Sequence, residues 1–174
     1  IKQPVMTTAR SGTQGITAIL PLLVAAEHHG IGNERLVRAV ALSHLVTIYI
    51  KTFTGTLSSV CGCSIAAGVG ATAGITWLLE GEEDQIAGAI NNMIGNLAGM
   101  VCDGAKHSCA LKIATSVSEA VTAAYLALKD IYIDNWNGIV SPTAEISIRD
   151  LSKICTAGMK NMDQEIIEVM LSQS

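Results

Sequence analysis

The stretch CSIAAGVGATAGITWLL, residues 63–79, carries no charged side chain and consists almost entirely of small and apolar residues. Its glycines Gly68, Gly70 and Gly74 favour a helix whose backbone packs closely against neighbouring helices. The stretch is shorter than the ~20 apolar residues that a helix needs to cross a bilayer. We therefore expect a buried helix at the centre of a soluble bundle, in preference to a membrane span.

The sequence beyond this stretch predicts a second buried helix over residues 86–100. The acidic residues 82–84 suit its first turn, because negative charge there complements the helix dipole. Its apolar residues recur at three- and four-residue spacing and are Ile86, Ile90, Met93, Leu97 and Met100. No alternating run is long enough for a sheet. The predicted class is all-α: a helical bundle with central hydrophobic Gly/Ala-rich helices, two of them antiparallel neighbours.

Five further helices are expected around this pair, at residues 16–29, 33–54 and 109–129, from residue 141 onward, and at 163–171. Residues 12–15 are interpreted as a loop before the first of them. Pro21 should kink that helix or delay its start, and Pro142 suits a first helical position. The helix over residues 33–54 is expected to bury one apolar stripe, formed by Leu36, Val37, Val40, Ala41, His44, Leu45 and Ile48.

The composition limits the partners that this chain can have. Charged residues make up 15% of the chain, whereas about 25% is usual, so part of the surface is expected to meet another domain or subunit. The net charge of −4 offers no basic patch, which excludes nucleic acid as the expected partner. Neither an initiator Met nor an apolar signal region is present at Ile1-Lys2-Gln3-Pro4, so the chain is expected to be part of a longer protein.

Four of the five cysteines lie in two short motifs beside predicted helix ends: Cys61-Gly62-Cys63, and the run from Cys102 to Cys109. The odd total argues against an oxidised secreted framework and favours the cytoplasm. If the two central helices are antiparallel, the motifs meet at one end of the bundle. Gathered thiolates can hold an iron–sulfur cluster or zinc, and the alternative is that they are small buried residues.

A polar, glycine-bearing segment comes before the first predicted helix. It consists of Ser11, Gly12, Thr13, Gln14 and Gly15. Free backbone N–H groups at a helix start can hold a carboxylate or a phosphate, and a plain turn is the alternative.

Together these motifs resemble a known enzyme family. The chain resembles the L-cysteine desulfidase branch of the iron–sulfur serine dehydratase α-chain family over nearly its whole length. Thr13 and His107 depart from the pattern expected of that family. The motifs that carry the resemblance are Ser11-Gly12-Thr13-Gln14-Gly15-Ile16, Cys61-Gly62-Cys63, Gly95-Asn96-Leu97-Ala98-Gly99-Met100-Val101-Cys102-Asp103-Gly104-Ala105-Lys106 and Cys109-Ala110-Leu111-Lys112.

The resemblance implies a lyase that does not use pyridoxal phosphate. Three cysteines would hold a [4Fe–4S] cluster, namely Cys102, Cys109 and either Cys61 or Cys63, and the open iron would act as a Lewis acid on the leaving thiol or hydroxyl. β-Elimination from L-cysteine or L-serine then gives pyruvate and ammonia, with hydrogen sulfide from L-cysteine. Residues 11–15 would help to hold the small amino-acid substrate, and the general base stays unidentified.

The same resemblance bears on organisation and partners. Family proteins are longer, so residues 1–174 are expected to be a single domain from their C-terminal part that meets a missing N-terminal domain and can form a homo-oligomer. No membrane partner is expected. The alternative from another class is a zinc-stabilised helical module with a structural or interaction role.

Overall fold

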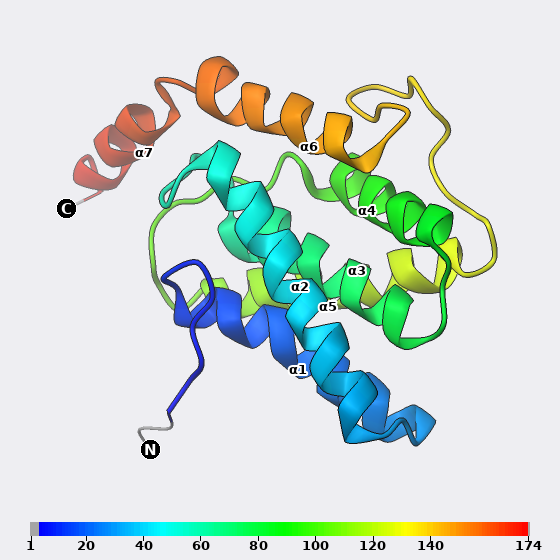
Figure 1. Cartoon of the computed structure of the whole chain (residues 1–174). Helices are drawn as coiled ribbons and strands as arrows, with labels where there is room; N and C mark the ends of the chain where they lie inside the picture. Colours follow the sequence, from blue (N-terminus) through cyan, green and yellow to red (C-terminus); the bar gives the residue numbers. More distant parts are fainter. Residues whose placement is uncertain (1–3, 174) are drawn as a thin grey trace.

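The computed structural model describes residues 4–173, so Ile1–Gln3 and Ser174 lie outside the described part. It consists of helices joined by loops, with no strand within residues 4–173, and this confirms the predicted all-α class (Figure 1). The elements are α1 (Gly12–His29), α2 (Asn33–Thr54), the π-helical η1 (Cys63–Gly68), α3 (Val69–Leu78), α4 (Glu83–Leu97), α5 (Cys109–Ala127), α6 (Ala144–Lys153), the π-helical η2 (Ile154–Gly158) and α7 (Met162–Leu171).

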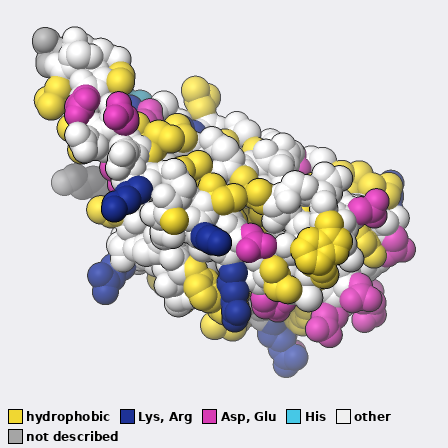
Figure 2. Space-filling model, turned by 90° about the horizontal axis from the view of Figure 1, so that it is seen from above, with side chains coloured by type: hydrophobic (Ala, Val, Ile, Leu, Met, Phe, Trp, Pro, Cys, Tyr) yellow, Lys and Arg dark blue, Asp and Glu magenta, His cyan; other side chains and the backbone are white. Residues whose placement is uncertain are grey.

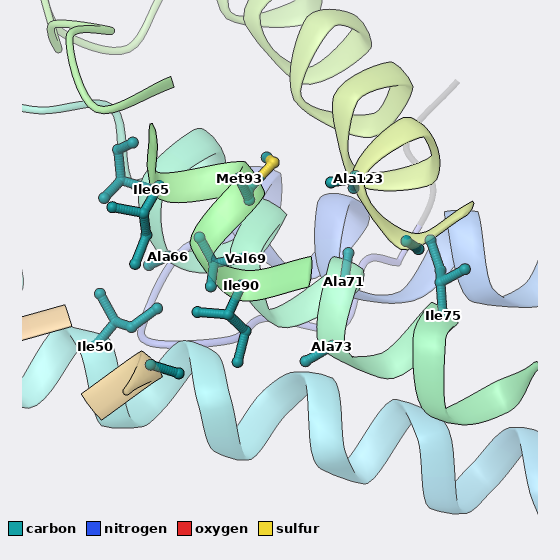
Figure 3. Packing of buried hydrophobic residues seen from close by; sticks show 14 of the residues in the cluster. Ile50, Ile65, Ala66, Val69, Ala71, Ala73, Ile75, Ile90, Met93 and Ala123 are labelled. Carbon is teal, nitrogen blue, oxygen red and sulfur yellow. The ribbon is translucent and has the colours of Figure 1, made fainter. Parts of the chain in front are cut away.

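The continuous helix formed by η1 and α3 lies at the centre of the bundle, as predicted. All residues of η1 and all of α3 except Trp77 are buried. Helices α1, α2, α4 and α5 pack around it. Figure 3 shows side chains of this helix among residues of α2, α4 and α5, including Ile50, Ile90, Met93 and Ala123. This arrangement removes the apolar central stretch from water, which is the main favourable term in folding.

Glycines allow α2 to approach this central helix closely. A Cβ atom at Gly70 would overlap the Ser43 carbonyl oxygen and the Thr47 hydroxyl of α2. At Gly74 it would lie 2.7 Å from Leu22 Cδ2 of α1 and 3.0 Å from the Ala39 carbonyl oxygen. The two backbones therefore pack at a distance that no larger residue at these positions permits.

The predicted buried face of α2 is only partly correct, because Leu36 and Val40 pack against the core and other apolar residues of the predicted stripe do not. Val37, Leu45 and Ile48, placed on that face by their spacing, are 59%, 65% and 47% exposed. The close approach to glycine instead selects small and hydroxyl-bearing side chains, which satisfy their polar atoms locally: Ser43 Oγ donates to the Ala18 carbonyl oxygen at 2.9 Å. The residues of α2 that are buried are Ala39, Ser43, Thr47, Ile50, Lys51 and Thr54.

Two predicted helix starts also differ from the structure. Residues 12–15 form the first turn of α1 and not a loop, because Ser11 caps the helix and its side chain accepts from the Gln14 N–H at 3.4 Å. Pro21 lies inside α1. Helix α6 begins at Ala144 with Thr143 as its cap, so Pro142 precedes it. In both cases a side-chain cap decided where the helix begins.

The C-terminal helix α7 projects from the body of the bundle (Figure 1), and none of its residues is buried. On the face seen from above, hydrophobic side chains interrupt the polar surface, while acidic ones gather toward one end (Figure 2). Among the described helices, α2 alone is long and apolar enough to cross a membrane, a criterion that core helices of soluble proteins also meet.

Replacement of Gly70 by Ala tests the close contact between α2 and α3. We expect Gly70→Ala to lower the free energy of unfolding by roughly 1–3 kcal/mol, the usual cost of overpacking a core. Gly99→Ala is the matched control, since a Cβ there meets no atom within 4 Å; its effect should stay within about 0.5 kcal/mol. Urea denaturation measures both, and equal midpoints for the two variants would contradict the packing described here.

Candidate functional site

Backbone hydrogen bonds hold the two cysteine motifs side by side. The segment before η1 and the segment after α4 form an isolated antiparallel bridge between Val60 and Val101. The Cys61 N–H donates to the Met100 carbonyl oxygen at 2.7 Å, and the Cys102 N–H donates to the Ser59 carbonyl oxygen at 2.8 Å. Two segments 41 positions apart in the sequence are thereby fixed next to each other at one end of the central helix.

Cys61 and Cys63 are neighbouring thiols at the start of η1, and both side chains are buried. On its other side Cys63 Sγ lies 3.2 Å from Thr13 Oγ1, which in turn lies 2.9 Å from Ser11 Oγ. The Cys63 thiol donates this hydrogen bond to Thr13. Hydrogen bonds therefore connect the cap of α1, through Thr13, to Cys63.

The surroundings of the two thiols give Cys61 and Cys63 different pKa values. The Cys63 side chain, together with the backbone N–H groups of Ser64 and Cys63, lowers the pKa of Cys61 to about 6, against the opposing effect of burial. The pKa of Cys63 is raised, because the neighbouring Cys61 and burial both disfavour its charged form. Cys61 is therefore the more acidic thiol of the pair.

The second motif is organised by an aspartate between two lysines. Asp103 accepts from Lys106 Nζ at 2.8 Å and also from Lys112 Nζ, and Lys112 further donates to the Val101 carbonyl oxygen at 2.9 Å. The hydrogen bonds from Lys106 and Lys112 hold the pKa of Asp103 well below its usual range. The half-buried Cys109 at the start of α5 accepts weakly from the Lys106 N–H at 3.5 Å.

Lys51 brings a buried cation to the same region from α2. Its side chain is 9% exposed, and Nζ donates to Ser58 Oγ at 3.5 Å. Burial lowers the pKa of Lys51, while Cys102 and the other nearby thiols oppose this effect. The sequence analysis missed this residue. The available signal was a lysine one position after Ile50 within an apolar run, but its direction depends on how α2 packs.

Unsatisfied polar atoms gather at this end of the molecule. Among residues 4–173, five buried side-chain oxygen atoms have no hydrogen-bond partner. Four of them belong to residues in or beside the motifs described above, namely Thr8, Gln14, Ser64 and Ser108. Gln14 is packed directly against Gly62, where a Cβ atom would lie 2.6 Å from the Gln14 side-chain nitrogen. Buried polar groups without partners are costly, and they are typical of a site that receives a ligand.

Backbone strain coincides with these unsatisfied groups. Ala9 and Arg10 both adopt left-handed conformations, with φ of 46° and 67°, directly before the cap of α1. The turn is closed by reciprocal backbone hydrogen bonds between Thr8 and Ser11, at 3.2 and 3.0 Å. Non-glycine residues in this region cost about 1–3 kcal/mol each and are enriched at functional sites. The turn fixes the start of α1 beside the thiol pair.

The predicted site residues thus lie in one region of the molecule, but not all of them contact one another. Residues 11–14 reach Cys63 through Thr13, while Gly15 packs under Met6, whose carbonyl oxygen a Cβ atom would overlap. Within residues 4–173, no three Cys, His, Asp or Glu side chains lie close enough together to hold a metal ion. The donor set nevertheless fits an iron–sulfur cluster in its chemistry, since all the candidate ligands are cysteines outside any disulfide and the pKa of Cys61 is lowered. The ligand assignment stays a prediction.

Comparison with known protein families gives a match that includes all of the motifs described above. The family model described as serine dehydratase alpha chain matches residues 1–168. The chain belongs to this family. The match extends over every element that contributes to the site, from the cap of α1 to the start of α5.

Relatives of this serine dehydratase alpha-chain family member include proteins named UPF0597 protein. One from Clostridium tetani is 52% identical over 170 residues, which is 98% of this chain and 40% of the relative. Another from Clostridium botulinum strain Okra is 53% identical over 169 residues, or 97% of this chain and 38% of the relative. The chain therefore spans about 40% of the length of these relatives. No solved structure matches it.

Removal of the Cys63 thiol tests its effect on the acidity of Cys61. In Cys63→Ala we expect the pKa of Cys61 to rise toward the usual thiol value of about 8.5, because the neighbouring thiol that lowers it is lost. The wild-type thiol, with its lowered pKa, is mostly deprotonated at pH 7 and should alkylate faster there than in the variant. Peptide-resolved iodoacetamide labelling across pH measures this, with Cys155→Ala as control. An unchanged midpoint in Cys63→Ala would refute the pairing.

Proposed function

We propose that residues 1–174 act as one catalytic domain of an iron–sulfur lyase, independent of pyridoxal phosphate, that catalyses β-elimination from a small L-amino acid. The observation that carries this proposal is the pair of hydrogen bonds that connects Ser11 and Thr13 to Cys63, next to Cys61. It joins a helix start suited to a carboxylate to thiols suited to a cluster. Membership of the serine dehydratase alpha-chain family supports the same reading.

Cys102, Cys109 and Cys61 would hold the [4Fe–4S] cluster. The preference for Cys61 over Cys63 rests on two points: Cys61 is the more acidic thiol of the pair, and its backbone is bonded to the segment that carries Cys102. Cys63 would then remain a thiol that donates to Thr13. When bound, the cluster supplies a Lewis-acidic iron for the leaving group of the substrate.

The start of α1 would bind the substrate carboxylate. The N–H groups of Gly12 and Thr13 have no acceptor within the helix, and the helix dipole favours negative charge at this end. The unpartnered oxygen atoms of Gln14 and Ser64 are acceptors for the substrate ammonium group. Lys51 would balance the negative charge that several thiolates bring into a buried region.

The substrate preference that we infer is L-cysteine over L-serine. It rests on the Cys-Gly-Cys and Cys-Asp-Gly-Ala-Lys motifs, which resemble the desulfidase branch, and a soft thiolate is a good ligand for iron. The reduced cytoplasm is the compartment that such a site requires, and all five cysteines are unpaired. The alternative function, a zinc-stabilised structural module, rests on the same thiols and predicts a colourless protein without turnover.

Replacement of one thiol tests the proposal. The test uses a protein as long as the relatives, which is called the full-length protein below. After anaerobic reconstitution with iron and sulfide, we expect absorption near ~400 nm and formation of pyruvate from L-cysteine faster than from L-serine. Cys102→Ser should abolish absorption and turnover together. Cys155→Ser removes a buried thiol outside both motifs and should retain both. Turnover that survives Cys102→Ser, or a colourless protein that binds zinc, would refute the iron–sulfur assignment.

A further inference from the structure

An apolar groove runs along the surface between α1 and α5. It encloses about 460 Å³ and is floored by Ile75 of the central helix and by small residues of α5 such as Ala110 and Ala114. Its α1 wall carries Leu20 and Val24, which are 51% and 61% exposed. Contiguous apolar surface of this kind is unusual on a protein that has no partner there.

The walls of the groove carry no full charge. Neither helix contributes a Lys, Arg, Asp or Glu side chain to the lining, and the polar groups sit at one end, where His29 Nε2 lies 2.7 Å from the Tyr125 hydroxyl. A matching surface must therefore be apolar along its length, since a charged side chain would be desolvated without a partner. An acidic or basic peptide does not fit this groove.

The opposite end of the groove opens at the candidate site. Ile16, which lines it, lies one turn after Thr13, and Ala110 directly follows Cys109. Cys102 and Cys109 are both half-buried, so the thiol region remains open to solvent on this side. An occupant of the groove would end next to these thiols and could exclude water from them.

We propose that the α1–α5 groove receives an apolar or amphipathic helix from the part of the full-length protein outside residues 1–174. The relatives supply the argument for this occupant, because the chain spans only about 40% of their length and their remaining polypeptide must pack against something. A helix in a groove places apolar residues at i, i+3 or i+4, and i+7 against such walls. This interface concerns assembly of the protein and holds whether or not the thiols carry a cluster.

Side-chain footprinting of the full-length protein tests the proposal. In this chain alone, Leu20 and Val24 are 51% and 61% exposed, so hydroxyl radicals should label both side chains readily. In the full-length protein we expect much weaker labelling of both residues, measured against the same protein unfolded in guanidinium. Val24→Glu should raise labelling of Leu20 several-fold, because a charge in the groove displaces the helix. Val37→Glu is the matched control, at a residue 59% exposed on α2 and outside the groove, and should leave Leu20 protected.

Two results would overturn this assignment. Labelling of Leu20 and Val24 in proportion to their exposure in this chain would mean that the groove is open in the full-length protein. Protection that disappears on dilution, in step with loss of a dimer in native mass spectrometry, would mean that a second copy covers it. The wild-type measurement decides both questions even if Val24→Glu does not fold. Loss of catalytic activity with the groove still protected would count against the proposed function alone.

Discussion

The close approach of α2 to the glycine face of α3 is the contact on which the rest of the structure depends. Gly70 and Gly74 present bare backbone to Ser43, Thr47 and Ala39, and the hydroxyls there bond to helix carbonyl oxygens. With α2 fixed at this distance, the central helix is enclosed by four helices and its uncharged sequence is removed from water. The same contact leaves Val37, Leu45 and Ile48 of α2 exposed and turns Lys51 inward.

The candidate site lies where the central helix begins. Its first turns are π-helical at Cys63–Gly68, and such segments are frequent at functional sites. The wider turn coincides with buried polar oxygen atoms that lack partners and with two strained residues before α1. Each of these features costs stability. Their coincidence at one end of a well-packed bundle is what a site held ready for a ligand requires.

The hydrogen bond between Cys63 and Thr13 would connect the proposed substrate-binding position at the start of α1 with the thiols. A charge placed there would act on Thr13, which contacts Cys63, and Cys63 in turn lowers the pKa of Cys61. Asp103 stabilises the neighbouring loop through Lys106 and Lys112, so the segment that carries Cys102 is anchored independently of the thiol pair. The groove between α1 and α5 begins at the same place, so an occupant of the groove, as proposed above, would also cover the site.

The sequence by itself determined the all-α class, the burial of the helix within residues 63–79 and the meeting of the two cysteine motifs. Small residues at helical spacing in a long uncharged stretch favour a buried helix over a strand or an exposed helix. Tertiary structure alone decided which face of α2 is buried. Periodicity favours the apolar stripe, but close packing on Gly70 excludes those larger side chains and selects Ser43 and Thr47. Tertiary structure also decided the place of Lys51 and the thiol hydrogen bond to Thr13, since both join residues far apart in the sequence through contacts that no local pattern encodes.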